Sequence, residues 1–191
     1  MYLKVLKRVN VFDNYVLFAI KKYMKNKYLD RFMPIATSMG NFGAIWIIMA
    51  VILILDEPYR LIGSIVILTL IISTIVGEGI VKHTVRRIRP FNYKDNINLL
   101  IAKPISYSFP SGHTLSSFAV AEVLSRYFSQ YNLIFIGIAF LIALSRLYLY
   151  VHYPTDIIAG VIIGTLCSKL IFMILQEGYM ESIVTFYQNI L

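Results

Sequence analysis

Long uncharged stretches, each bounded by polar or turn-forming residues, dominate this sequence. Residues 34–55 carry no charge and would form about 33 Å of helix, which matches the hydrocarbon thickness of a bilayer. Further apolar stretches follow at 61–76, 111–128, 132–150 and 154–175. The pattern predicts an all-α integral membrane protein, a bundle with five transmembrane helices.

Residues 11–28 show a helical period instead of a continuous apolar run. We expect one face to carry Phe12, Tyr15, Val16, Ala19, Ile20, Tyr23 and Met24. We expect the other face to carry Asp13, Asn14, Lys21, Lys22 and Lys25. The uncharged run within this segment is too short to cross a bilayer, so the pattern predicts an N-terminal amphipathic helix in the membrane interface. The alternative is a short sixth crossing, which leaves five to six transmembrane helices.

Composition supports a membrane protein. The 191 residues are 58% hydrophobic and 15% charged, whereas a soluble domain is about half apolar and a quarter charged. The length allows a single domain, residues 1–191. The net charge is +8, but the cations flank apolar spans, so anionic headgroups or phosphate substrates fit better than nucleic acid. The tail, residues 176–191, is weakly amphipathic and is expected at the interface.

Charged and polar residues interrupt the apolar pattern in three stretches, 82–90, 108–113 and 145–156. Alternating helices place all three stretches on the same membrane face. No helix breaker precedes Pro90, so the second helix is expected to continue through Arg87. Lys82, Arg86 and Arg89 would then share one face. Glu78 lies one turn before Lys82 and can pair with it.

These stretches carry the groups that a phosphate monoester requires. Lys82, Arg89 and Arg146 supply three cations for a dianion. Ser111 and Gly112 follow Pro110 and open a helix, whose free N–H groups and dipole favour an anion. A bland interpretation also exists, in which the cations only anchor a span and the serine only caps a helix. The occurrence of the whole set on one membrane face favours a phosphate-binding site over this bland interpretation.

Two histidines have separable tasks in such a site. His152 has Asp156 behind it, which orients an imidazole and makes it the better nucleophile. His113 lies at a cationic helix start and is the better acid. Taken alone, His152 could also be an interfacial histidine in an aromatic belt with neighbouring tyrosines. His83 points away from Lys82 and is left out of the site. The three cations would repel a divalent metal, so we expect neither a metal nor another cofactor.

The three motifs together resemble the signature of the type 2 phosphatidic acid phosphatase superfamily, which includes the vanadium haloperoxidases. They are Lys82-x6-Arg89-Pro90, Pro110-Ser111-Gly112-His113 and Ser145-Arg146-x5-His152-x3-Asp156. The resemblance covers roughly residues 34–175.

The resemblance implies a helical bundle, usually of six spans, and metal-independent hydrolysis of a lipid phosphate through a phosphohistidine on His152. It implies that His113 is the acid and that Asp156 orients His152. It also implies that the phosphate is bound by Lys82, Arg89, Ser111, Gly112 and Arg146.

The expected activity is that of a membrane lipid phosphatase. Its substrate would be a phosphomonoester or pyrophosphate such as phosphatidylglycerol phosphate, undecaprenyl pyrophosphate, phosphatidic acid or a lipid A phosphate. A lipid phosphotransferase and a phospholipid-binding or transport protein are the alternatives. Counting Lys and Arg places the motif face inside. The resemblance instead implies the outer face of the cytoplasmic membrane, which we adopt. Residues 91–109 are expected to form a lid or substrate rim.

Overall fold

The computed structural model describes residues 2–93 and 98–175, and every regular element in those residues is helical. The all-α prediction is therefore confirmed. The α-helices are α1 (Tyr2–Ala19), α2 (Lys27–Met39), α3 (Ala44–Leu55), α4 (Arg60–Thr74), α5 (Lys82–Val85), α6 (Gly112–Tyr127), α7 (Asn132–Tyr148) and α8 (Pro154–Ile174). Short 3-10 or π-helical segments are η1 (Ile20–Met24), η2 (Asn41–Gly43), η3 (Glu57–Tyr59), η4 (Ile75–Val81), η5 (Pro90–Tyr93) and η6 (Ser129–Tyr131). The predicted interfacial tail lies outside the described residues.

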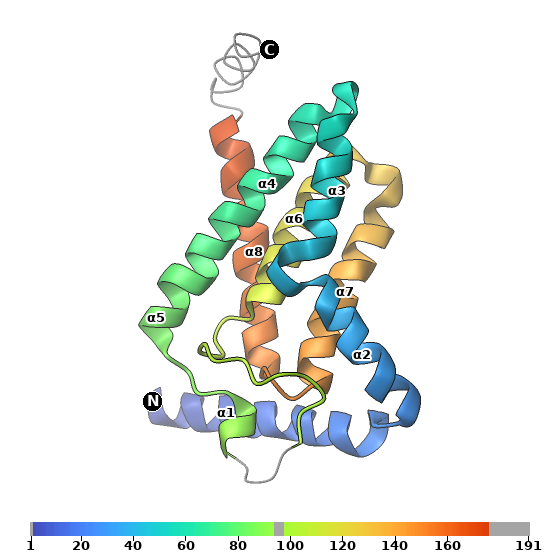
Figure 1. Cartoon of the computed structure of the whole chain (residues 1–191). Coiled ribbons are helices and arrows are strands. Elements are labelled where there is room, and N and C mark those ends of the chain that lie inside the picture. Colours follow the sequence, from blue (N-terminus) through green and yellow to red (C-terminus); the bar gives the residue numbers. More distant parts are fainter. Residues whose placement is uncertain (1, 94–97, 176–191) are drawn as a thin grey trace.

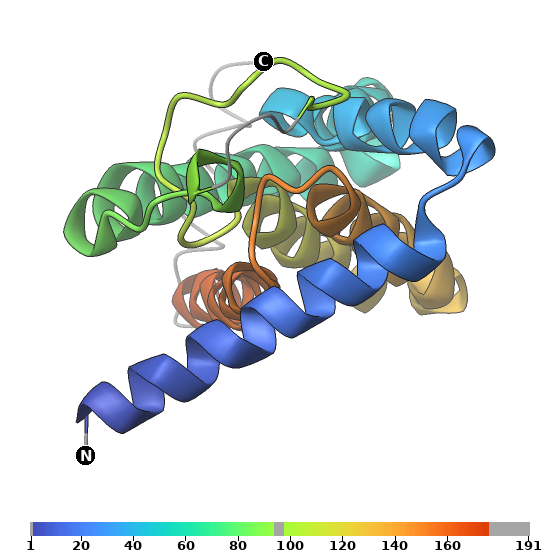
Figure 2. The ribbon, with the colours of Figure 1, turned by 90° about the horizontal axis from the view of Figure 1, so that it is seen from below.

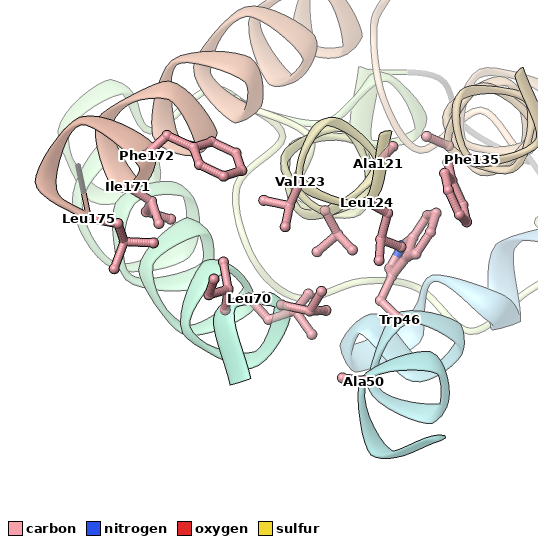
Figure 3. Close-up of a cluster of buried hydrophobic side chains, with 14 of the residues drawn as sticks. Trp46, Ala50, Leu70, Ala121, Val123, Leu124, Phe135, Ile171, Phe172 and Leu175 are labelled. Carbon is pink, nitrogen blue, oxygen red and sulfur yellow. The ribbon is translucent and has the colours of Figure 1, made fainter. Parts of the chain in front are cut away.

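Helix α6 forms the centre of the bundle and packs against α4, α7 and α8 (Figure 1). The main core surrounds it, with Trp46 and Ala50 from α3, Phe135 from α7 and Ile171 from α8 (Figure 3). The Trp46 indole donates a hydrogen bond of 3.0 Å to Ser117 on α6, so the buried ring also satisfies its polar atom.

Helices α6 and α8 approach closely because α8 has glycine at two positions of their contact, Gly160 and Gly164. A Cβ atom added at Gly164 would lie 2.4 Å from the Leu115 carbonyl oxygen. A Cβ at Gly160 would lie 3.0 Å from the carbonyl oxygen of Ser111. The small-xxx-small pair therefore fixes α8 against the helix that carries Ser111 and His113.

Three stretches are long and apolar enough to cross a membrane, namely Glu57–Asn92, Ser129–Tyr148 and Pro154–Ile174. The pair formed by α2 and α3 would be a fourth, but it is bent by 51°. The predicted continuous helix over 34–55 is therefore wrong, because the helix is broken within this stretch. Gly43 adopts a left-handed conformation with φ 72°, and Phe42 before it has φ 52°, so the helix breaks there. Helix α6 has only 16 residues, about 24 Å of helix, and does not qualify as a span by length.

The predicted extension of the second helix through Arg87 is also wrong. Helix α5 ends at Val85, and Arg86 adopts a left-handed conformation with φ 50°. Its N–H still donates to the Lys82 carbonyl oxygen at 3.0 Å. The chain then leaves the helix, so Arg86 is exposed whereas Arg89 is buried, and the two do not share a face.

Helix α1 runs across the end of the bundle instead of along it (Figures 1 and 2). The described part of the N-terminal segment does not include a helix that qualifies as a span. The structure shows which side of α1 faces the bundle. Asp13 and Leu17 face the bundle and are fully buried, whereas Phe12, Tyr15 and Phe18 are exposed.

We expect Gly164→Ala to destabilise the protein by about 1–3 kcal/mol, because the new methyl group would force α6 and α8 apart. The change is measured as a fall in the midpoint of thermal unfolding in detergent. Gly137→Ala on α7 is the matched control, since a Cβ there has no neighbour within 4 Å. That change should leave the midpoint unchanged or raise it. Equal midpoints for both variants would contradict the close contact.

Candidate active site

The three polar stretches of the sequence meet in one pocket of about 370 Å³. Six of the eight predicted site residues line it: Lys82, Arg89, Gly112, His113, Arg146 and His152. The other two, Ser111 and Asp156, lie behind its wall and are fully buried. The break between α2 and α3 forms the opposite wall, through Gly40–Gly43.

The three predicted cations are almost completely buried, each with 3% of its surface exposed. Lys82 begins α5, Arg146 lies in the last turn of α7, and Arg89 follows the left-handed turn at Arg86. Lys82 Nζ contacts Glu78 Oε1 at 2.5 Å, as predicted from their spacing. Three buried cations face one carboxylate here, so the pocket favours an anion.

Two of these cations are held by groups that leave further donors free. Arg89 Nε donates to the Ser106 carbonyl oxygen at 2.7 Å, and its Nη1 donates to the Val151 carbonyl oxygen at 2.9 Å. Arg146 Nη1 donates to the Thr37 hydroxyl. Arg146 Nε is buried and has no partner among the described residues. An unpaired buried N–H is costly, so this donor indicates that an acceptor belongs in the pocket.

The start of α6 forms another part of the wall. Ser111 caps the helix, and its Oγ accepts from the Thr114 hydroxyl at 2.9 Å. The Ser111 side chain therefore supports the helix start and does not line the pocket. Gly112 does line it, and a Cβ there would lie 2.3 Å from Glu78 Oε1. The absence of a Cβ at Gly112 lets the Glu78 carboxylate approach the helix N-terminus this closely.

His152 lies in the turn between α7 and α8, outside the spans, where Tyr150 adopts a left-handed conformation with φ 61°. Its Nε2 is 3.1 Å from Arg89 Nη1, and its Nδ1 is 3.5 Å from Asp156 Oδ2, an electrostatic contact without a hydrogen bond. Burial lowers the pKa of His152 well below its ordinary value, and the nearby Arg89, Arg146 and Lys82 lower it further. The imidazole is therefore neutral at pH 7, with Nε2 toward the pocket and Nδ1 toward the carboxylate.

His113 occupies the opposite wall, near the break between α2 and α3. Its Nε2 is 2.9 Å from Asn41 Oδ1 in η2. A Cβ added at Gly40 would lie 2.8 Å from the His113 ring, so the missing side chain makes room for the imidazole. His83, the third histidine, is exposed and does not line the pocket.

Several polar residues of the site were not identified from the sequence. Thr37 and Asn41 come from the broken helix, and Ser106 from the 98–109 loop also lines the pocket. The loop therefore contributes to the rim, although residues 94–97 are outside the described part. No local motif marks these three residues, because their side chains form hydrogen bonds with groups distant in the sequence.

Behind His152 lies an ion network that was also missed. Arg87 Nη1 donates to Asp156 Oδ1 at 2.7 Å, and Arg87 Nη2 donates to Asp13 Oδ2 at 2.6 Å. No local pattern marks Asp13 or Arg87, because their partners lie far away in the sequence. Among residues 2–93 and 98–175, no three His, Cys, Asp or Glu side chains form a cluster that could hold a metal ion.

The comparisons with known proteins agree on one family. The profile of the PAP2 superfamily matches residues 62–179. An undecaprenyl-diphosphatase of Sulfolobus acidocaldarius is 33% identical over 91% of this chain and 84% of its own length.

Two solved structures are also similar. LpxE of Aquifex aeolicus superimposes with a TM-score of 0.72 at 27% identity, covering 84% of this chain and 94% of that one. A transmembrane PAP2-type phosphatidylglycerolphosphate phosphatase of Bacillus subtilis shares the fold, with a TM-score of 0.70 at 22% identity over 90% of this chain and 88% of that one. The motifs, the multi-pass helical fold and these matches together show that this chain belongs to the PAP2 superfamily.

Proposed function

We propose that the protein is a lipid phosphate phosphatase that cleaves a phosphomonoester or diphosphate at the membrane surface. The observation that carries the proposal is the pocket itself, where Lys82, Arg89 and Arg146 surround two imidazoles. Three buried cations and an unpaired Arg146 donor match the charge and the acceptor oxygens of a phosphate. The family membership and the relatives' activities support the same reaction class.

In the first step, His152 Nε2 attacks phosphorus and the bond from phosphorus to the leaving oxygen breaks. A phosphohistidine forms, and a protonated His113 donates its proton to the leaving oxygen. Burial and the neighbouring Arg146 and Lys82 lower the pKa of His113, so this role requires that the bound phosphate dianion raises that pKa again. The neutral state of His152 supports this role, because only a free nitrogen lone pair can attack. Arg89 Nη1 lies 3.1 Å from that nitrogen and would turn to the phosphate oxygens when substrate binds. Asn41 Oδ1 marks an acceptor position within reach of His113.

In the second step, water attacks the phosphohistidine and the bond from phosphorus to nitrogen breaks. His113 removes the proton from water, His152 regains its lone pair, and inorganic phosphate leaves. Lys82, Arg89, Arg146 and the start of α6 at Ser111 and Gly112 stabilise the charge throughout. These cations supply the electrostatic stabilisation, so the proposal requires no metal or other cofactor.

The undecaprenyl-diphosphatase reported above is similar over 91% of this chain, and its name gives undecaprenyl diphosphate as its substrate. Within the expected substrates, this favours an isoprenoid diphosphate over phosphatidylglycerol phosphate, phosphatidic acid or a lipid A phosphate. A lipid phosphotransferase would share the first step and pass the phosphoryl group to a lipid acceptor. Labelled diphosphate separates the two, because a phosphatase releases the label as inorganic phosphate and a transferase moves it to a second lipid.

We expect His152→Ala and His113→Ala each to lower phosphate release by at least about a hundredfold, since each removes a group that acts in both steps. The assay uses protein purified in detergent, a panel of lipid phosphates and isoprenoid diphosphates, and a chelator. His83→Ala is the matched control and should retain activity. Wild-type activity in both pocket variants would overturn the proposed roles.

We expect Glu78→Gln to tighten inhibition by vanadate, a mimic of trigonal phosphorus, by about tenfold. The carboxylate contacts Lys82 at 2.5 Å and occupies space beside Gly112, so an anion must compete with it. The measurement is the vanadate inhibition constant. Glu122→Gln, in the same helix as His113 but outside the pocket lining, should not change it. Weaker inhibition of the Glu78→Gln variant would contradict this competition.

We propose that the pocket opens on the extracytoplasmic face of the cell membrane. By the positive-inside rule, the cations of the motifs would place the pocket on the cytoplasmic face. Lys82, Arg89 and Arg146 are buried in the pocket and make contacts there, so we do not count them toward the rule. Ile105 is fully exposed on the loop beside the pocket. The turn between α3 and α4, which contains Glu57, lies at the end of the bundle away from α1 (Figure 1).

The orientation is tested with single cysteines and a membrane-impermeant maleimide on intact cells. Ile105→Cys should be labelled directly, whereas Glu57→Cys should be labelled only after permeabilisation. The native Cys167 is buried in α8 and gives the background. The reverse pattern would place the pocket on the cytoplasmic face.

A further inference from the structure

We propose that Asp13, on the N-terminal helix α1, is a positioning residue for the reaction and acts through Arg87 on Asp156 and His152. Helix α1 would thus be part of the active-site apparatus, although it contributes no residue to the pocket wall. The inference rests on the proposed function and extends it to a segment outside the three motifs.

Asp13 is fully buried, which is unusual for a carboxylate and requires compensation. Each of its oxygens is satisfied by the start of α8 or by Arg87. Oδ1 accepts the Thr155 backbone N–H at 3.0 Å, and Oδ2 accepts the Thr155 hydroxyl at 2.7 Å. Oδ2 also accepts from Arg87 Nη2 at 2.6 Å. This one side chain therefore fixes α1 to the residue that precedes Asp156.

Arg87 transmits the position of Asp13 to the site. Its Nη1 donates to both Asp156 Oδ1 and the Thr155 hydroxyl at 2.7 Å. Its guanidinium also lies over the Tyr153 ring, 3.9 Å from the ring centre. Together with Asp13, four different groups thus hold one planar cation, and a lysine could not reproduce that geometry.

The consequence for Asp156 is a fixed carboxylate. Arg87 holds Oδ1, and the Tyr153 backbone N–H donates to Oδ2 at 2.9 Å. Oδ2 is thereby left facing His152 Nδ1 at 3.5 Å. Small displacements of a group that orients a nucleophile can cost about a hundredfold in rate. A change at Asp13 would move Arg87, and Asp156 would lose its second support.

The charges of the network also depend on Asp13. Two fully buried carboxylates, Asp13 and Asp156, share the guanidinium of Arg87. Without the charge of Asp13, Arg87 would interact with Asp156 alone and would neutralise more of the negative charge that faces His152. Both the position of the Asp156 carboxylate and the electric field at the His152 imidazole would change. The cations proposed to bind phosphate would remain in place.

Helix α1 is also held against the turn that carries His152. Leu17, one helical turn after Asp13, is fully buried in a cluster with Leu149, Val151 and Tyr153 of that turn. Figure 2 shows α1 lying across the end of the bundle beside α8. The apolar contact holds α1 against the bundle, and the Asp13–Arg87 ion pair fixes its position along the helix axis.

The test is steady-state kinetics with a lipid phosphate that the wild-type protein hydrolyses. Wild type and His152→Ala are measured first. We expect Asp13→Asn to lower kcat by about 10- to 100-fold while KM stays within about twofold, because phosphate binding does not use the network. Arg87→Lys should behave in the same way. Asp30→Asn is the charge-matched control, since its carboxylate accepts from Tyr148 away from the pocket wall, and it should retain kcat.

A double-mutant cycle separates positioning from a merely structural role. In an Asp156→Asn background, Asp13→Asn should lower kcat by less than about twofold, because its effect passes through Asp156. A loss of the same size in both backgrounds would overturn the inference, as would unchanged kcat in Asp13→Asn. If Asp13→Asn does not fold, Asp13→Glu keeps the charge and displaces it by one methylene. It should then lower kcat only when Asp156 is present.

The outcomes also separate the two proposals. A wild-type protein that hydrolyses lipid phosphate and loses that activity in His152→Ala supports the proposed function, whatever Asp13→Asn does. A wild type without activity on the substrate panel would overturn the proposed function and this inference together.

Discussion

The structure depends on one electrostatic constraint, which is the burial of three cations around a pocket that contains a single partly exposed carboxylate. Lys82, Arg89 and Arg146 come from three separate segments, and each is almost inaccessible to solvent. Burial of like charges is unfavourable unless an anion compensates them. Glu78 partly supplies that charge through its contact with Lys82. A phosphate can supply more, which is why the family's chemistry fits this position.

The backbone irregularities of the bundle serve this pocket. The left-handed turn at Arg86 ends α5 and brings Arg89 back to the site. The break at Gly40–Gly43 admits the His113 ring and brings Asn41 to it. Strained backbone persists only where the surrounding packing fixes it. The regular helices α6, α7 and α8 provide that rigid frame.

His152 is defined from two sides. Its Nε2 faces the pocket and Arg89, whereas its Nδ1 faces Asp156, which Arg87 and the Tyr153 backbone hold in place. In the proposed reaction, the pocket side would bind the phosphate and the rear side would orient the imidazole. Helix α1 belongs to the rear side through Asp13, so a network of contacts connects this surface helix to the proposed nucleophile.

The sequence by itself determined the helical class, the positions of most spans, and the residues that could bind and attack a phosphate. Those signals are local, because apolar length, proline and glycine placement, and motif spacing are readable within one segment. It also determined the Glu78–Lys82 pair, which lies within one helical turn. Only the tertiary structure decided that α2 and α3 are broken, that Arg86 leaves the helix, and that Asp13 is buried. Each of these depends on contacts between segments far apart in the chain, and a buried ion pair such as Asp13–Arg87 has no local pattern to indicate it.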